Sequence, residues 1–300
     1  MGKLGDVGLV GYVGLGIMGL PMAKNLARKS GISVVGYDVS KERCGLFREY
    51  GAIADNPEEI YGGCDVVFFC LPTNELLEGC VEALISVAPK GTTVVDMGST
   101  SPEVIRSLSP AAQEKGISLI DSPVSGGEPK AIDGTLALMC GGNEEAFRRV
   151  APLLAMMGST VTYMGGSGNG SVAKLANNMI VGCNIAAVGE AFCFALKAGL
   201  NIETLFEAIR RGFAGSAVLE SKAPLVIQGA FTPPSARVSV HQKDLKNAVA
   251  LAEKMGVEIP LSHKVLDYMN ELETQGLAGE DHGAVARIYE QTMGVKLGKS

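Results

Sequence analysis

Closely spaced glycines separate an apolar run from a helical pattern near the start of the chain. The run Val7–Val13 reads VGLVGYV, and helical periodicity begins at Pro21. A G-x-G-x-x-G turn between strand and helix allows a tight turn, a close backbone approach to a pyrophosphate, and close helix packing. The phosphates would rest on the helix N-terminus, where free N–H groups favour negative charge. We therefore expect a dinucleotide site at Gly14, Leu15, Gly16, Ile17, Met18 and Gly19.

An acidic residue follows at the spacing that such a site requires. The next β-rich run, SVVGYD, ends in Asp38, 19 residues beyond Gly19. A carboxylate there accepts hydrogen bonds from both ribose hydroxyls of the cofactor and repels a 2′-phosphate. The sequence therefore predicts NAD as cofactor, with NADP possible but less favoured. In the alternative interpretation, Asp38 only begins a turn with Val39 and Ser40.

The pattern of apolar residues changes character about halfway along the chain. Up to about Met164, short β-rich runs alternate with helical segments, which predicts an α/β fold whose sheet has a parallel core and helices on both faces. After the Gly-rich stretch 165–170, only helical patterns follow, over residues 171–198, 202–211, 221–227, 243–255, 261–273 and 284–293. We predict an N-terminal Rossmann dinucleotide-binding domain, residues 1–167, and an all-α domain for substrate and oligomerisation, residues 168–300. The first long helix is apolar nearly all round, and we expect it to be buried between the domains.

Other strand ends are predicted to lie along the same crevice, because ligands bind beyond the carboxyl ends of such strands. Two of these stretches follow the β-rich runs that end near Cys70 and Asp96, and each could also be a simple turn. A third, Ser125-Gly126-Gly127, could bind a carboxylate through successive backbone N–H groups, or merely connect two elements.

Lys174 is the most informative single residue. It lies near the start of the long apolar helix, where the helix dipole and hydrophobic neighbours both lower the pKa of a lysine. Such a lysine can exchange a proton near neutral pH. Asn178 follows at i+4 on the same face and could orient a substrate. The alternative is a lysine that extends from a helix end to solvent.

Two further groups of polar residues carry less information. Lys243 and Asp244 are predicted to begin a helix, where such a pair is usually solvated. The three histidines have no spacing typical of a metal site or a catalytic triad, so we assign neither.

Composition excludes several classes of partner. The net charge is −6, and the basic residues are scattered, which argues against nucleic acid and anionic membranes. Seven cysteines without a C-x-x-C pair are typical of reduced thiols. We expect no signal peptide, because glycines punctuate the N-terminal segment, and no stretch reaches about 18 consecutive apolar residues. A cytoplasmic location is therefore expected.

Four motifs in order resemble the β-hydroxyacid dehydrogenase family over about residues 7–289: GLGIMGLPMAKNL, DSPVSGGEPKAIDGTLALMCGG, GNGSVAKLANNMI and KDLKNA. The resemblance implies that Lys174 is the catalytic acid/base, that Asn178 orients substrate, and that Ser125, Gly126 and Gly127 hold its carboxylate. It also implies cofactor contacts from Leu71, Pro72, Thr73 and Ser99, with Lys243 near the nicotinamide. Members of this family commonly form homodimers or homotetramers.

Within that family, GGEPKAIDGTL, residues 208–224 and DHGAVARIYE most resemble the tartronate semialdehyde reductases. This likeness implies NAD(H)-dependent reduction of tartronate semialdehyde to glycerate. Alternatives within the family are 3-hydroxyisobutyrate and 2-(hydroxymethyl)glutarate dehydrogenases. An alternative of another class is a non-catalytic, dimeric binding or scaffold module with the same fold. Such modules lose the lysine, whereas Lys174, Asn178 and Lys243 are all present here.

Overall fold

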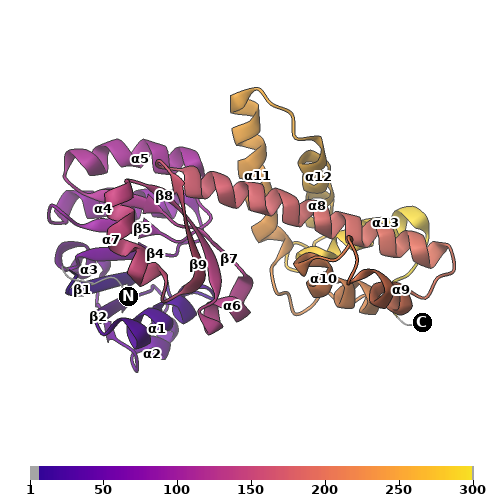
Figure 1. The fold of residues 1–300 in the computed structure, drawn as a ribbon, viewed down its shortest axis with the longest axis horizontal. Helices are drawn as coiled ribbons and strands as arrows, with labels where there is room; N and C mark the ends of the chain where they lie inside the picture. Colours follow the sequence, from indigo (N-terminus) through magenta and orange to yellow (C-terminus); the bar gives the residue numbers. More distant parts are fainter. Residues whose placement is uncertain (1–6, 299–300) are drawn as a thin grey trace. The chain divides into compact units, whose positions relative to one another are not determined.

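The computed structural model describes residues 7–298, and the chain divides into two compact units, residues 1–174 and 175–300. The division falls inside one continuous helix, α8 (Asn169–Lys197), which Figure 1 shows as the longest helix in the chain.

Among the described residues of the first unit, nine strands form one sheet in the order β3-β2-β1-β4-β5-β6-β8-β7, with β9 beside β8. The strands are β1 (Leu9–Val13), β2 (Ser33–Tyr37), β3 (Ala52–Ile53), β4 (Val66–Phe69), β5 (Thr93–Asp96), β6 (Ser118–Asp121), β7 (Val124–Ser125), β8 (Leu136–Gly142) and β9 (Gly158–Gly165). The first six are parallel, and β8 runs antiparallel to β6 and β7. The order 3-2-1-4-5-6 is that of a Rossmann fold, which confirms the predicted α/β class.

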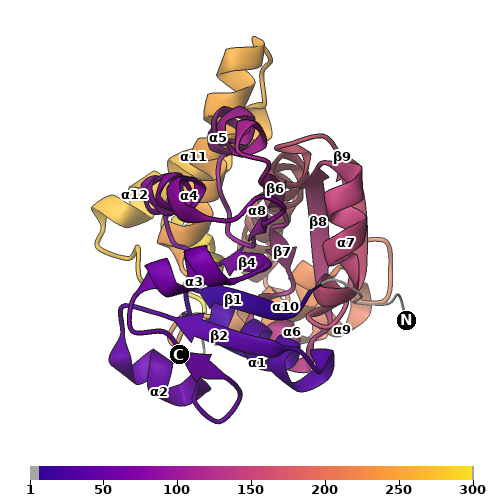
Figure 2. The same cartoon turned by 90° about the vertical axis from the view of Figure 1, so that its left-hand side faces the viewer.

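Helices cover both faces of this sheet (Figures 1 and 2). Apolar side chains of α1 (Gly19–Ser30) and α7 (Glu144–Leu154) pack on one face, together with parts of α2 (Lys41–Phe47) and α6 (Gly127–Asp133). On the other face lie α3 (Pro57–Gly63), α4 (Asn74–Val87) and α5 (Pro102–Glu114). The parallel strands are therefore buried on both faces, which explains their continuous apolar runs.

The second unit is helical. It contains most of α8 with α9 (Ile202–Ile209), α10 (Ala217–Gln228), α11 (Val238–Met255), α12 (Pro260–Thr274), the 3-10 helix η1 (His282–Val285) and α13 (Ala286–Met293). Among the described residues of this unit, the β pairing consists of one isolated bridge between Arg237 and Asp281. The buried core gathers apolar side chains from α8, α10, α11, α12 and α13. This part of the chain confirms the predicted all-α character.

Helix α11 begins earlier than the sequence predicts. Its first residue is Val238 rather than Lys243, so Lys243 and Asp244 lie in the second turn. Val238 is fully buried, and His241 and Gln242 are buried as well. The predicted start was wrong because His241 and Gln242 are polar and interrupt the apolar pattern, whereas in the structure they face the interior of the unit.

Helix α8 is long and apolar enough to cross a membrane by length and composition alone, with a mean hydropathy of 1.8 in its most apolar window. Its hydropathy has another explanation in this structure. Ile185, Phe192 and Cys193 are buried in the core of the second unit. A core helix that is apolar on most sides accounts for the pattern.

Candidate active site

The parallel strands of the first unit end in one row. Backbone pairing places Val13 beside both Tyr37 and Phe69, Phe69 beside Asp96, and Asp96 beside Asp121. The segments that follow these strands therefore start at the same edge of the sheet. They contain the predicted cofactor residues, namely Gly14–Gly19 after β1, Asp38 after β2, Leu71–Thr73 after β4 and Ser99 after β5.

The three glycines of the first turn have different surroundings. Gly14 has a φ of 96°, and a Cβ at that position would overlap the carbonyl oxygen of Cys70. A Cβ on Gly19 would overlap the carbonyl oxygen of Gly14. Gly16 has no atom within 4 Å of where a Cβ would stand. The fold itself requires Gly14 and Gly19, whereas the open space at Gly16 fits a pyrophosphate lying against the backbone.

The Asp38 carboxylate holds the glycine turn to the end of β2. One oxygen, Oδ2, accepts a hydrogen bond of 2.7 Å from the backbone N–H of Leu15, and Oδ1 accepts one of 2.8 Å from Ser40. A carboxylate offers about four lone-pair positions, so two hydrogen bonds leave acceptor capacity for hydroxyl groups. The residues present therefore fit the adenosine ribose of a dinucleotide.

Two of the other predicted cofactor segments also begin helices. The Thr73 hydroxyl accepts a hydrogen bond of 3.3 Å from the N–H of Leu76 and so caps α4. Ser99 lies just before Ser101, which caps α5 and donates its N–H to Asn74 Oδ1 at 3.0 Å. Capping alone explains a threonine at 73 and a serine at 101.

The Ser125-Gly126-Gly127 turn leads from β7 into α6. Gly126 has a φ of 139° and Gly127 a φ of 71°, values that side chains rarely adopt. Ser125 is half-buried, and both glycines are exposed. The turn therefore has the accessible backbone that recognition of an anion needs.

Asp121 connects this part of the sheet to the start of α8. Its carboxylate is fully buried and accepts hydrogen bonds from the backbone N–H groups of Gly168, at 2.9 Å, and Ser171, at 2.7 Å. Burial raises the pKa of Asp121, although these two donors act in the opposite direction. The anion therefore anchors the turn of α8 that comes just before Lys174.

Lys174 and Asn178 share one face of α8, because the helix is continuous and they are four residues apart. Lys174 is half-buried, and Asn178 is 8% exposed. The Asn178 side chain donates its Nδ2–H to Asp244 Oδ2 at 2.6 Å. Lys243 lies beside the same carboxylate, with its Nζ 3.9 Å from Asp244 Oδ1. The second unit thus brings Asn178, Asp244 and Lys243 together.

Two family models together match most of the chain. The NAD binding domain of 6-phosphogluconate dehydrogenase matches residues 9–165, and the NAD-binding domain of NADP-dependent 3-hydroxyisobutyrate dehydrogenase matches residues 168–289. The chain belongs to the β-hydroxyacid dehydrogenase family.

Individual members of the family match over nearly their whole length. The 2-hydroxy-3-oxopropionate reductase of Escherichia coli is 36% identical over 96% of this chain and 99% of its own. The 2-(hydroxymethyl)glutarate dehydrogenase of Eubacterium barkeri is 32% identical over 96% and 97%. The solved structure of Mycobacterium tuberculosis 3-hydroxyisobutyrate dehydrogenase with L-serine has a TM-score of 0.85 at 28% identity, covering 94% and 98%.

Sequence reasoning missed several residues that contact or anchor the predicted site residues. Asp121 ends a predicted strand and Asp244 stands in the KDLKNA motif, so both lay within segments that the motifs identified. The pair His241 and His282 gave no such signal, because 41 residues separate them in sequence. Their contact is created by the fold of the helical unit.

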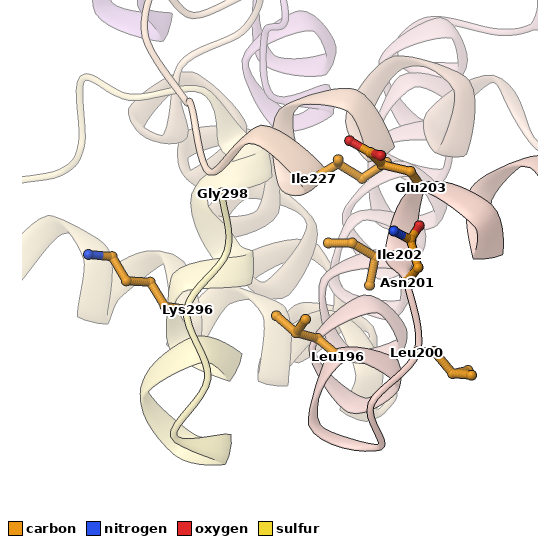
Figure 3. Close-up of a pocket in the computed structure, with 8 residues that line it drawn as sticks. All are labelled: Leu196, Leu200, Asn201, Ile202, Glu203, Ile227, Lys296 and Gly298. Atoms are coloured by element: carbon orange, nitrogen blue, oxygen red, sulfur yellow. The ribbon is translucent and has the colours of Figure 1, made fainter. Parts of the chain in front are cut away.

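The second unit also has a surface pocket of about 160 Å³ (Figure 3). Leu196, near the C-terminal end of α8, lines it together with Asn201, Ile202 and Lys296. Lys174, Asn178 and Lys243 are not among the residues that line it. This pocket therefore contains none of the predicted site residues.

Proposed function

We propose that this family member reduces a small carboxylate-bearing aldehyde to a 3-hydroxyacid with NADH, and that tartronate semialdehyde, giving glycerate, is its best substrate. The observation that carries the proposal is the shared face of Lys174 and Asn178 on α8, with Asp121 anchoring the turn before the lysine. The substrate choice is supported by the similarity to the E. coli reductase.

The cofactor would be held by the glycine turn 14–19, by Asp38 and by the segments containing Leu71–Thr73 and Ser99. Asp38 favours NAD over NADP, because its carboxylate would repel a 2′-phosphate. When bound, the reduced nicotinamide supplies the hydride that the carbonyl carbon receives. Lys243 would lie near that end of the cofactor.

The remaining steps belong to side chains of the protein. Ser125, Gly126 and Gly127 would hold the substrate carboxylate through the serine hydroxyl and backbone N–H groups. The Lys174 ammonium would stabilise negative charge that develops on the carbonyl oxygen and then give that oxygen a proton. Asn178 would fix the substrate against the lysine.

An absorbance assay at the nicotinamide band tests the proposal. NADH and NADPH should be compared with tartronate, methylmalonate and succinate semialdehydes. We expect the fastest oxidation with NADH and tartronate semialdehyde. Lys174→Ala should lower kcat by about 100-fold or more while NADH affinity stays within twofold. A folded K174A protein with full turnover would end the assignment of Lys174.

A second candidate substrate class has support of its own. The E. barkeri relative suggests a 2-(hydroxymethyl)glutarate dehydrogenase, and the solved relative a 3-hydroxyisobutyrate dehydrogenase. Faster turnover of either corresponding semialdehyde than of tartronate semialdehyde would favour that alternative. The roles proposed for Lys174 and Asn178 would be unchanged.

A further inference from the structure

Two buried histidines meet beside Asn178 in the helical unit. His241, on the first turn of α11, and His282, which begins η1, have their Nδ1 atoms 2.9 Å apart. His241 Nε2 lies 2.9 Å from the backbone carbonyl oxygen of Asn178. His241 is 4% exposed and His282 is 8% exposed. This cluster connects Asn178, a candidate substrate-binding residue, to two histidines that the proposed reaction does not use.

The contacts determine which ring nitrogens carry protons. A carbonyl oxygen only accepts hydrogen bonds, so His241 must be protonated at Nε2. In a neutral imidazole the other nitrogen is then an acceptor, and His282 must donate to it from Nδ1. When both rings are neutral, only one tautomer of each ring satisfies the 2.9 Å contacts.

The surroundings keep His282 neutral. Burial lowers its pKa to about 3, and the positive charge of Lys222 acts in the same direction. Asp281 is the one opposing group that contributes, and its carboxylate is already paired with Lys222 Nζ at 2.9 Å. A neutral His282 is the state that can donate from Nδ1 while leaving Nε2 unprotonated.

The His241 ring packs against α8 at Gly182. A Cβ on Gly182 would lie 3.4 Å from both Cε1 and Nε2 of that ring, at the limit of ordinary contact. Gly182 is one turn after Asn178, and the ring lies beside this turn with Nε2 at the Asn178 carbonyl. Asp244, three residues after His241, holds the Asn178 side chain at 2.6 Å. One face of α11 thus holds both the backbone and the amide of Asn178.

We infer that His241 is a positioning residue for the proposed reduction: it fixes the helical turn that carries Asn178, in the tautomer that His282 imposes. The role in turnover rests on the proposed function, whereas the hydrogen-bonded pair does not. A shift of about 1 Å in a residue that orients substrate can cost about 100-fold in rate. Displacement of Asn178 is therefore expected to lower kcat more than it weakens cofactor binding.

NMR of the imidazole nitrogens tests the pair directly. The chain has three histidines, and the third, His263, is exposed on α12 and serves as an internal reference. We expect His241 protonated at Nε2 and His282 at Nδ1, with the His282 pattern unchanged between pH 8 and 6. Protonation of His241 at Nδ1, or a second proton on His282 within that range, would overturn the inference.

Kinetics test the positioning role. His241→Phe should lower kcat about 10-fold or more with NADH affinity within twofold, and the matched variant His263→Phe should leave both unchanged. His241→Gln should recover part of the loss, because its Nε2–H can reach the same carbonyl. In an Asn178→Ala background, His241→Phe should cost less than twofold, since it acts through Asn178. Equal losses in both backgrounds would overturn the positioning role.

An inactive wild-type protein would count against the proposed function alone. In that case the Asn178 side-chain amide resonances decide the inference. They should shift in His241→Phe and stay in place in His263→Phe. Unshifted resonances in His241→Phe would overturn it.

Discussion

At the scale of single residues, two glycines of the turn 14–19 are predicted to have different roles. Gly14 is needed for stability, and Gly16 is needed for cofactor binding. Gly14→Ala should lower the free energy of unfolding by about 2 kcal/mol or more, because it forces a side chain into a positive φ and against Cys70. Gly16→Ala should change that free energy by less than about 0.5 kcal/mol, since the added Cβ points into open space. Urea unfolding of both variants checks the difference.

The same two variants distinguish a cofactor site from a structural turn. Gly16→Ala should weaken NADH binding by about 10-fold or more, because the methyl group would occupy the place of the pyrophosphate. Fluorescence titration with NADH measures this loss. Unchanged NADH affinity in the stable Gly16→Ala protein would remove this turn from the proposed cofactor site.

Asp38 gives a second residue-scale prediction, on cofactor choice. Asp38→Asn removes the negative charge that disfavours a 2′-phosphate, and the ratio of NADPH to NADH affinity should rise about 10-fold. Asp55→Asn, an exposed site on the loop before α3, is the matched control. If the ratio is the same in both variants, the carboxylate does not select the cofactor.

At the scale of elements, a buried ion pair joins α10 to the segment before η1. Lys222 Nζ lies 2.9 and 3.1 Å from the two oxygens of Asp281, which also accepts from Ser235 and Gly283. Burial alone would raise the pKa of Asp281, but the Gly283 N–H and the Lys222 ammonium lower it to about 2. The carboxylate is therefore charged and depends on its partners.

Lys222→Met should destabilise the protein by about 3–5 kcal/mol, because it leaves a buried carboxylate without its cation. The matched control is Lys246→Met, which removes a pair with Glu273 at 3.9 Å in which both side chains are 53% exposed. That change should cost less than about 1 kcal/mol. Similar unfolding midpoints in denaturant for the two variants would contradict the assigned roles.

Helices and strands could be predicted from the sequence more accurately than the contacts between their side chains. The β-rich runs that end near Val13, Asp38, Cys70 and Asp96 are strands, since a buried parallel sheet leaves continuous apolar runs. The two-residue strands β3 and β7 were missed because so short a run has no periodicity. The start of α11 and the partners of Asn178 could not be predicted, because they depend on side chains brought together from positions 63 and 66 residues apart.

At the scale of the whole molecule, the buried histidine makes stability depend on pH. His282 has its pKa lowered to about 3, whereas in the unfolded chain it returns to about 6.5. Between these values the unfolded state binds the extra proton, so the free energy of unfolding falls as pH falls. The slope from this one group is at most about 1.4 kcal/mol per pH unit.

Chemical denaturation at pH 7, 6 and 5 measures that slope. In His282→Gln the pH dependence of the free energy of unfolding should be shallower than in wild type. Taking the difference between the two proteins cancels the contributions of other groups, including the raised pKa of Asp121. Parallel curves for the two proteins would contradict a neutral, buried His282.

Subunit assembly is the other expectation at this scale. Ile180 and Phe194 on α8 are 63% and 67% exposed in the single chain. Burial of these side chains between subunits would remove apolar surface from water, which favours association. We expect a homodimer or homotetramer by light scattering, and a monomer at micromolar concentration would exclude it.

The histidine pair also limits how this chain can change over evolutionary time. A substitution at either position leaves a buried nitrogen of the other without its partner, at a cost of about 1–3 kcal/mol. Replacing both rings together, by apolar groups of similar shape, avoids that cost. Positions 241 and 282 should therefore covary among descendants of a common ancestor, although they are 41 positions apart in the sequence.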